Sequence, residues 1–482
     1  MKGIKRFASV LCVLALMGSL LSVTAWADDQ NVSLQINGEN LILTDARPEF
    51  KAGRTFIPAR IAFEALGAAV DWEQSTKSVI AVKDDITVVM SLGSTTAEVT
   101  KNGETKEVQM DVAPYSKGGR TYVPVRFAAE ALNCVVGWDG SNHTVIIVDL
   151  DALLGDATFE NLNGWMAAEA KQEQIDNALT TGSATLKLTV PDDAGVSKTY
   201  PLKVDFRSHA TQTKQQLELS TDFKDLARLL LEGSDLTTAE RNEFLKLCKA
   251  AMEARMDLST GKIYFTVDCP LLLELTEEAI GSGDIWYLTD INALLDEAGM
   301  SGDLMTYVQE VQSQVTGDMT FEELLYMILK LSEPDDANYS YDTMKLLVDL
   351  YCDILSDQAM VKSGNNYIVE STLEEEGAAF LLKMTYQTKG DRLVGVTVDM
   401  RLEDGYNDPV TMTMKVLEDG ANASITLNLD AGDGIKIDFA LSAKTVKATT
   451  EPAVEPPAGA QIVDVMEELN DATPWEDSLL TA

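Results

Sequence analysis

A long internal repeat limits what this chain can fold into more than any other feature of its sequence. The 30 residues from 53 to 82 recur 66 positions later, from 119 to 148, and 15 of the 30 positions are identical. So many matches within one chain indicate an internal duplication, which predicts the same small structural unit twice. The identical positions include Gly53/Gly119, Arg54/Arg120, Thr55/Thr121, Pro58/Pro124, Arg60/Arg126, Glu64/Glu130, Leu66/Leu132 and Trp72/Trp138.

Each copy predicts the same order of strands around one helix. Asn37-Gly38 and Asn102-Gly103 lie between short apolar runs, and Asn-Gly is typical of a tight β-hairpin because both residues accept a positive φ. Pro58 and Pro124 are expected to open a helix, where a missing N–H costs no hydrogen bond. Val-rich and Ile-rich strands follow each helix. We therefore predict two ββ-α-ββ units, at residues 31–83 and 96–149.

The arginines after the turn glycines have two explanations. Arg54 and Arg120 can bond to nearby carbonyl oxygens or to the carboxylates of Asp45 and Asp111. Alternatively, they bind an anionic ligand. Because both copies keep them together with the turn glycines and prolines, we favour a role in maintaining the fold.

The charged residues of the repeated helix also have either a structural or a ligand-binding explanation. Arg60 and Glu64 are spaced i, i+4 and can form an ion pair, and Arg126 and Glu130 have the same spacing in the second copy. These arginines could also contact an anionic ligand. Because both copies keep the same pair, we favour a structural role for them.

The tryptophan after each helix has two explanations as well. Trp72 and Trp138 could stack on sugar rings, but their alternation with Val70 and Val136 places them on the buried face of a strand. We favour core packing and predict that the repeated motif residues are structural.

The repeated pattern also resembles a known family. N-G…D…P…G-R-T-x-x-P-x-R-x-x-x-E-x-L-G-x-x-V-x-W, over residues 31–149, is similar to the copper amine oxidase N-terminal-like domain, also called the stalk domain. That family is common in exported proteins of Gram-positive bacteria. The resemblance implies a non-catalytic appendage that carries no copper.

Amine oxidase activity is not expected, because the residues for its copper site are too few. Three His ligands and a Tyr that becomes a quinone are needed, whereas the chain has only His143 and His209. Asn338-Tyr339 is followed by Ser340, where the quinone motif has an acid. Catalytic signatures such as G-x-S-x-G and H-E-x-x-H are also missing. We predict no catalytic, metal or cofactor residues, with a hydrolase as the unfavoured alternative.

Residues 1–27 predict a secretory signal peptide. Lys2, Lys5 and Arg6 precede an apolar run at residues 7–23, and Ala25-Trp26-Ala27 has the small-x-small pattern of a cleavage site. An N-terminal membrane anchor is the alternative, but the run is short for a bilayer span. We expect the mature chain to be secreted or associated with the cell envelope.

The negative charge of the chain is concentrated after the repeat. Of the net charge of −39, −36 comes from residues 151–482, which carry 60 acidic and 24 basic residues. Nucleic acid is excluded as a partner because its binding needs a basic surface. The acidity is explained either by solubility or by cation buffering. The expected partner is a cell-envelope component or another exported protein.

Four cysteines remain after removal of the signal peptide: Cys134, Cys248, Cys269 and Cys352. They allow three complete disulfide connectivities, and the sequence leaves their redox state open. Cys134 replaces Ala68 of the first copy, so we interpret it as a small buried side chain. Cys248 and Cys352 each fall on a predicted helix, and a disulfide bond between them is one possibility.

Beyond the repeat, the chain predicts a helical connector at residues 151–180 and an acidic α+β domain at residues 181–450. Strands are expected at 184–190, 198–206, 212–220, 261–265 and 284–287, and helices at 222–258, 290–298, 304–315, 320–331 and 343–355. A Pro-rich tail, 451–482, is predicted to end with a short helix at 462–469.

From Tyr367 onward the chain predicts a regular meander. Turn residues recur every 13 to 15 positions, and between them apolar and polar residues alternate. Six antiparallel strands with one apolar face need a cover, which the preceding helices can supply. This arrangement resembles lipoprotein-carrier half-barrels, and the resemblance implies a groove for acyl chains.

Together these features predict an α+β protein: a duplicated ββ-α-ββ stalk domain, residues 28–150, followed by a larger antiparallel β-meander packed on helices. The predicted function is a non-enzymatic, exported cell-envelope module that presents an acidic domain. The alternative is a carrier or sensor of a hydrophobic or lipidic ligand in residues 181–450.

Overall fold

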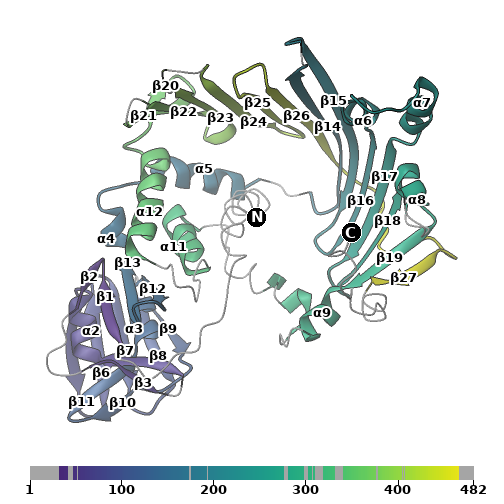
Figure 1. The fold of residues 1–482 in the computed structure, drawn as a ribbon. Helices are drawn as coiled ribbons and strands as arrows, with labels where there is room; N and C mark the ends of the chain where they lie inside the picture. The colour runs from purple at the N-terminus through teal and green to yellow at the C-terminus, as the bar shows by residue number, and fades with distance from the viewer. Residues whose placement is uncertain are drawn as a thin grey trace, which may run out of the picture. The chain divides into compact units, whose positions relative to one another are not determined.

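The chain is a mixed α+β protein with one very large β-sheet (Figure 1). The computed structural model describes residues 32–41, 47–51, 53–101, 103–172, 175–192, 194–275, 281–297, 302–306, 308–309, 319–331, 340–375, 378–403, 405 and 408–465. The predicted signal peptide, Asp45, Asn102 and Asn338-Tyr339 lie outside these residues. The chain forms two compact units: unit 1 is Met1–Ala170 with Gly317–Met360, and unit 2 is Lys171–Thr316 with Val361–Ala482.

Unit 1 contains both copies of the repeat. The first copy contains β1 (Ser33–Ile36), β2 (Glu39–Asn40), β3 (Glu49–Lys51), β4 (Arg54–Pro58), α2 (Ala59–Ala65), β5 (Ala69–Glu73) and β6 (Ser78–Lys83). Strand β7 (Ile86–Ser91) connects it to the second copy, which contains β8 (Thr96–Lys101), β9 (Glu104–Gln109), β10 (Tyr115–Lys117), β11 (Arg120–Pro124), α3 (Val125–Glu130), β12 (Cys134–Asp139) and β13 (Thr144–Asp149).

The two copies exchange strands, so neither copy completes a sheet by itself. One sheet has the order β12-β13-β1-β2, in which the last strands of copy two continue into the hairpin of copy one. A second sheet, β5-β6-β7-β8-β9, is the reciprocal arrangement, with β7 inserted. The third sheet, β10-β11-β4-β3, joins the middle strands of both copies. The sequence predicted the units one by one, and this interleaving is a correction to that description.

The turn chemistry of the repeat matches its sequence. Asn37 and Gly38 have φ values of 49° and 84° and form a two-residue turn that pairs Ile36 with Glu39. Gly67 and Asn133, just beyond α2 and α3, have φ values of 82° and 63°. These left-handed residues end both helices where the sequence predicts them to end.

Among the described residues, four further helices belong to unit 1: α4 (Leu150–Leu154), α5 (Glu160–Ala170), α11 (Phe321–Leu331) and α12 (Tyr341–Leu355). The last two fall within residues 181–450, which the sequence predicts to be a separate domain, but their contacts group them with the repeat. Phe159 packs on Phe321 at a centroid distance of 4.7 Å, and Lys330 of α11 donates to Glu130 Oε2 at 2.8 Å.

Unit 2 is built on a single 14-stranded sheet. Its order is β20-β21-β22-β23-β24-β25-β26-β14-β15-β16-β17-β18-β19-β27. The strands are β14 (Ala178–Pro191), β15 (Ser197–Ala210), β16 (Lys214–Asp222), β17 (Lys249–Asp257), β18 (Lys262–Asp268), β19 (Ile285–Asp290), β20 (Val361–Ser363), β21 (Asn366–Glu375), β22 (Ala378–Lys389), β23 (Arg392–Glu403), β24 (Val410–Asp419), β25 (Asn422–Asp430), β26 (Lys436–Lys447) and β27 (Gln461–Asp464).

The predicted six-strand meander is present as β21 to β26, in consecutive antiparallel pairs. The meander is not separate from the earlier strands, because β26 pairs antiparallel with β14 over twelve residues. Figure 1 shows the strands side by side in one curved sheet. The two strand groups that the sequence predicts apart are therefore one continuous surface.

Three sequence predictions in unit 2 need correction. Residues 249–257 form strand β17 rather than the end of a helix, since apolar and charged residues alternate there. Buried Cys248 accordingly lies just before a strand. The predicted helix at 462–469 begins instead as strand β27, parallel to β19; its residues after 465 lie outside the described residues.

The helices of unit 2 are short. In the described part of the chain they include α6 (Lys224–Leu230), α7 (Thr238–Lys246), α8 (Pro270–Leu275) and α9 (Ile291–Glu297), and residues 304–306 and 308–309 are helical as well. Helix α7 begins with the predicted capping box, in which Thr237 and Glu240 bond reciprocally. Helices α6, α8 and α9 pack on β15, β17 and β18. The longer predicted helices, at 320–331 and 343–355, belong to unit 1 as α11 and α12.

Candidate functional site

The repeated arginines after the turn glycines lie in the middle sheet of unit 1. Gly53 and Gly119 have φ values of 75° and 74°, as the turns require. Arg54 forms an ion pair with Asp111, which belongs to the other copy of the repeat. Both side chains are about half exposed, so the pair joins the two copies at the surface. Arg120, the counterpart of Arg54, is exposed at the start of β11.

The prolines and threonines of the motif have structural positions. Pro58 and Pro124 occupy the N-cap positions of α2 and α3, with φ values of −62° and −61°. Thr55 and Thr121 are half-buried on β4 and β11. These residues therefore form the connection from strand to helix in each copy.

The two repeated Arg and Glu pairs differ between the helices. Arg60 Nη1 lies 3.3 Å from Glu64 Oε1 on the exposed side of α2, as the i, i+4 spacing predicts. On α3, Arg126 is exposed, and the described ion pair of Glu130 is with Lys330 of α11 instead of with Arg126. This is a correction to the predicted pair of the second copy. Its physical reason is that α11 brings a cation to α3 from elsewhere in the chain, which sequence spacing does not reveal.

The two tryptophans of the motif pack against the core of unit 1. The ring nitrogen of Trp72 donates to Gln74 Oε1 at 2.9 Å, and Trp138 meets His143 edge-on at a centroid distance of 6.1 Å. Both indole rings are partly buried. This geometry fits the packing role better than a sugar-stacking platform.

A buried ion pair connects the final strands of the two copies. Lys83 Nζ lies 2.5 Å from Asp149 Oδ2, and the two side chains are 14% and 11% exposed. Burial alone would lower the pKa of Lys83, but its contact with Asp149 outweighs burial and raises it. Cys134 is fully buried, and burial, together with the charge of Asp149, raises the pKa of its thiol to about 12. This thiol is therefore an inert core side chain.

The described residues offer no metal centre: no group of three or more His, Cys, Asp or Glu side chains among them could hold an ion. The two histidines lie in different units. His209 is 3% exposed and its Nε2 lies 2.8 Å from Asn177 Oδ1. The four cysteines described are free thiols.

The feature in unit 2 that suggests a binding function is one face of the sheet. Pairing across eight strands aligns a row of apolar side chains: Val369, Met384, Val398, Met414, Leu427, Phe439, Leu186 and Leu202. At about 4.8 Å per strand this row is about 34 Å long. On the same face the sheet continues with Phe206, Leu219, Met252 and Val267. We call this surface the apolar face.

The opposite face of the same strands has a different chemistry. The residues next to the apolar row on each strand point to the opposite face and form a second aligned row: Glu370, Lys383, Asp399, Thr413, Asn428, Asp438 and Lys187. These side chains bond to one another: Lys383 to Glu370 at 2.6 Å and Thr413 to Asp399 at 2.7 Å. The sheet therefore has one solvated face, the polar face, and one face that water solvates poorly.

The apolar face is only partly buried. Val369 and Val398, on β21 and β23, are buried. Further along the row Met414, Leu427 and Phe439 are half-buried, and Leu402 and Val416 of the same face are 46% and 37% exposed. Since sheet side chains of this size are normally covered by a second layer, the surface fits a hydrophobic ligand. The apolar rows contain no ionisable side chain.

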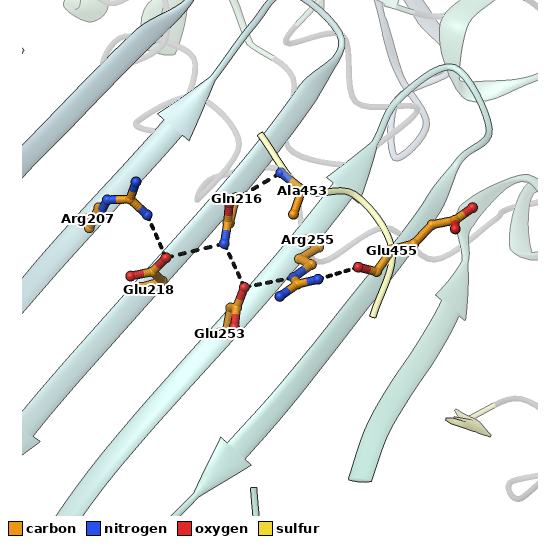
Figure 2. Close-up of polar contacts among 7 residues, drawn as sticks. All are labelled: Arg207, Gln216, Glu218, Glu253, Arg255, Ala453 and Glu455. Carbon is orange, nitrogen blue, oxygen red and sulfur yellow. Dashed lines mark hydrogen bonds and ion pairs between the residues drawn. The ribbon is translucent and has the colours of Figure 1, made fainter. Parts of the chain in front are cut away.

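A polar network lies on the polar face at β15 to β17 (Figure 2). Gln216 Nε2 donates to Glu253 Oε1 at 2.7 Å and to Glu218 Oε1 at 3.2 Å. Arg207 and Arg255 each donate to one of these carboxylates at 2.7 Å. The network also contacts residues 453 and 455 of the tail. Sequence patterns do not reveal this network, because its members meet only in the folded sheet.

Comparison with known families identifies part of unit 1. Residues 35–147 match the family described as copper amine oxidase N-terminal domain. This domain family is non-catalytic, so the match is consistent with a non-enzymatic module. The match to the copper amine oxidase N-terminal domain covers most of the repeat and lies wholly within unit 1. No curated protein matches the chain. None of the described helices is both long and apolar enough to cross a membrane.

Proposed function

We propose that this chain is a non-enzymatic, exported cell-envelope protein that holds lipid acyl chains on the apolar face of unit 2. Unit 1 serves as the stalk, the structural appendage that its family match suggests. The observation that carries the proposal is the strand register, which gathers apolar side chains from β21 to β19 on one surface.

The chemistry of this surface favours acyl chains over a protein partner. Protein interfaces combine an apolar centre with aromatic and Arg anchors and about one hydrogen bond per 100–200 Å². The apolar rows have no charged group, and apart from Phe206 and Phe439 they consist of aliphatic residues and methionines such as Met252, Met384 and Met414. Methionine is flexible and adapts to ligands of varied shape. A chain of CH₂ groups gains about 0.8 kcal/mol for each group buried there.

Extraction of the protein from its source cell tests the ligand. The intact chain would be purified without detergent, analysed by native mass spectrometry and extracted with organic solvent. We expect a co-purified lipid, lost after extraction. Repeated recovery of ligand-free protein that also fails to take up added lipid would count against the proposal.

Cell fractionation tests the location. Cleavage after Ala27 and recovery of the mature chain outside the cytoplasm are expected from the signal-peptide pattern. Recovery of an uncleaved chain from the cytosol alone would refute the export part of the proposal and leave the ligand question open.

A further inference from the structure

The segment that follows β26 crosses the polar face of the sheet instead of leaving it. Ala448 N donates to Asn177 O at 2.9 Å. The chain then passes the polar network on β16 and β17 (Figure 2), and residues 461–464 form β27 beside β19. We call residues 448–460 the strap, and the residues beneath it, Asn177, Gln216, Arg255 and the edge of β19, the track.

The track contacts the main chain of the strap. Asn177 Nδ2 donates to Thr450 O at 2.7 Å. Gln216 Oε1 accepts from Ala453 N at 3.2 Å, and Arg255 donates to the carbonyl oxygen of Glu455. Main-chain contacts do not depend on which side chains the bound segment carries, so the track can accept other sequences.

The groups that make these contacts are held in place by the sheet itself. Arg255 is 12% exposed, donates to Glu253, and lies 4.6 Å above the ring of Trp286. Gln216 is fixed by two carboxylates, which orient its amide so that the oxygen faces the strap. A binding site whose polar groups are already oriented loses little entropy when a segment binds.

Few strap side chains are buried. Pro452 is buried, whereas Glu451, Glu455 and Pro457 are exposed. Pro452, Pro456 and Pro457 favour an extended backbone before binding. Strand β27 then adds to the edge of the sheet in parallel register, Ile285 opposite Gln461 and Leu288 opposite Asp464. The requirements of the track are thus an extended, proline-containing backbone followed by a strand.

We propose that the track is a binding site for extended, proline-containing peptides, that the tail of this chain occupies it in cis, and that a peptide of the same chemistry can replace the tail in trans. This inference concerns the polar face and is independent of the ligand proposed for the apolar face.

The test uses the full chain with a site-specific protease sequence inserted between Ala448 and Thr449, where the residues on the C-terminal side are exposed. After folding and cleavage, the tail is held only by the track. Size-exclusion chromatography at micromolar concentration measures its retention, and fluorescence anisotropy follows its exchange with an excess of a labelled synthetic peptide, residues 449–465.

We expect the cleaved tail to be retained and to exchange with the peptide. The double variant Gln216→Ala/Arg255→Ala should weaken peptide binding at least tenfold, whereas Arg401→Ala, on a distant strand of the same sheet, should leave it unchanged. Circular dichroism confirms that each variant is folded.

Three results would overturn the proposal. They are immediate loss of the cleaved wild-type tail, retention of the tail without any exchange, and equal binding by the wild type and a folded double variant. If the double variant fails to fold, retention and exchange in the cleaved wild type still decide the question.

Discussion

The two units bury their apolar side chains to very different extents. Of the 53 hydrophobic residues that are buried among the described residues, 44 lie in unit 1 and nine in unit 2. Unit 1 closes its interleaved sheets around α2 and α3, and Phe63, Val123 and Leu132 are fully enclosed there. On the apolar face of unit 2, Val369 and Val398 are buried, but most of the row, from Met414 to Leu202, stays half-buried. The difference suggests that unit 1 is complete as it stands, whereas unit 2 presents a surface for a ligand.

The largest difference is expected between two leucine truncations. Leu132→Ala leaves a cavity in the core of unit 1 and should lower its free energy of unfolding by about 2–5 kcal/mol. Leu427→Ala removes a half-buried side chain from the apolar face and should cost about 1 kcal/mol. Calorimetry of the ligand-free chain, in which the units can unfold separately, measures both. Equal losses would show that the apolar face is packed like the core, contrary to the comparison.

The ion pairs of the two units give a second contrast. Lys83→Met leaves Asp149 charged and buried, and should destabilise unit 1 by about 3 kcal/mol. Lys436 and Asp430 of unit 2 also form a pair, at 2.7 Å, but are 53% and 40% exposed. Lys436→Met should therefore destabilise unit 2 much less than Lys83→Met destabilises unit 1, because exposed ion pairs contribute little to stability. Urea unfolding measures the loss of unfolding free energy in each variant. A larger loss in Lys436→Met than in Lys83→Met would contradict this contrast.

A smaller effect is expected where Asp357 holds the start of α5. Its carboxylate accepts from Glu160 N at 2.6 Å, Asn161 N at 3.0 Å and Thr158 Oγ1 at 2.9 Å. Burial alone would raise its pKa, but these hydrogen bonds outweigh burial and lower it. Asp357→Asn should cost unit 1 about 1–2 kcal/mol at neutral pH, as loss of a helix cap does.

The pH dependence of that effect has a definite sign. Because the pKa of Asp357 is lower in the folded chain than in the unfolded chain, its stabilisation is complete above the unfolded value of about 4. It is lost as the pH falls through the folded value. Stability curves of wild type and Asp357→Asn should therefore converge below about pH 4. A constant gap down to pH 2 would mean that the charge of Asp357 contributes nothing.

Local patterns predicted much of this fold. Asn37-Gly38, Pro58 and Gly67 specify their turn and helix ends through their own backbone preferences, and alternation specifies β21 to β26. The pairings between distant segments could not be predicted, because β26 with β14 and β1 with β13 depend on contacts that no short window contains. Residues 249–257 directly follow helix-favouring residues, and only their own alternation of apolar and charged side chains indicates strand β17.

The candidate site likewise has features that local patterns predict and features that depend on pairing between distant strands. Alternation along each strand predicted which side chains share a face, so the apolar rows of the meander could be anticipated. The width of the apolar face could not be predicted, since it depends on the register between β26 and β14. Arg207, Gln216 and Arg255 come from three strands, and no spacing in the sequence indicates that they meet.

Titration of the full chain with a fluorescent acyl-chain probe tests the central claim most directly. Met414→Glu/Leu427→Glu places two charges on the apolar face, and Thr413→Glu/Thr426→Glu places the same charges on the polar face of the same two strands. We predict saturable binding to the wild type, at least tenfold weaker binding to the first variant, and nearly unchanged binding to the second. Binding that is lost equally in both variants, or in neither, would contradict the assignment of the ligand to the apolar face.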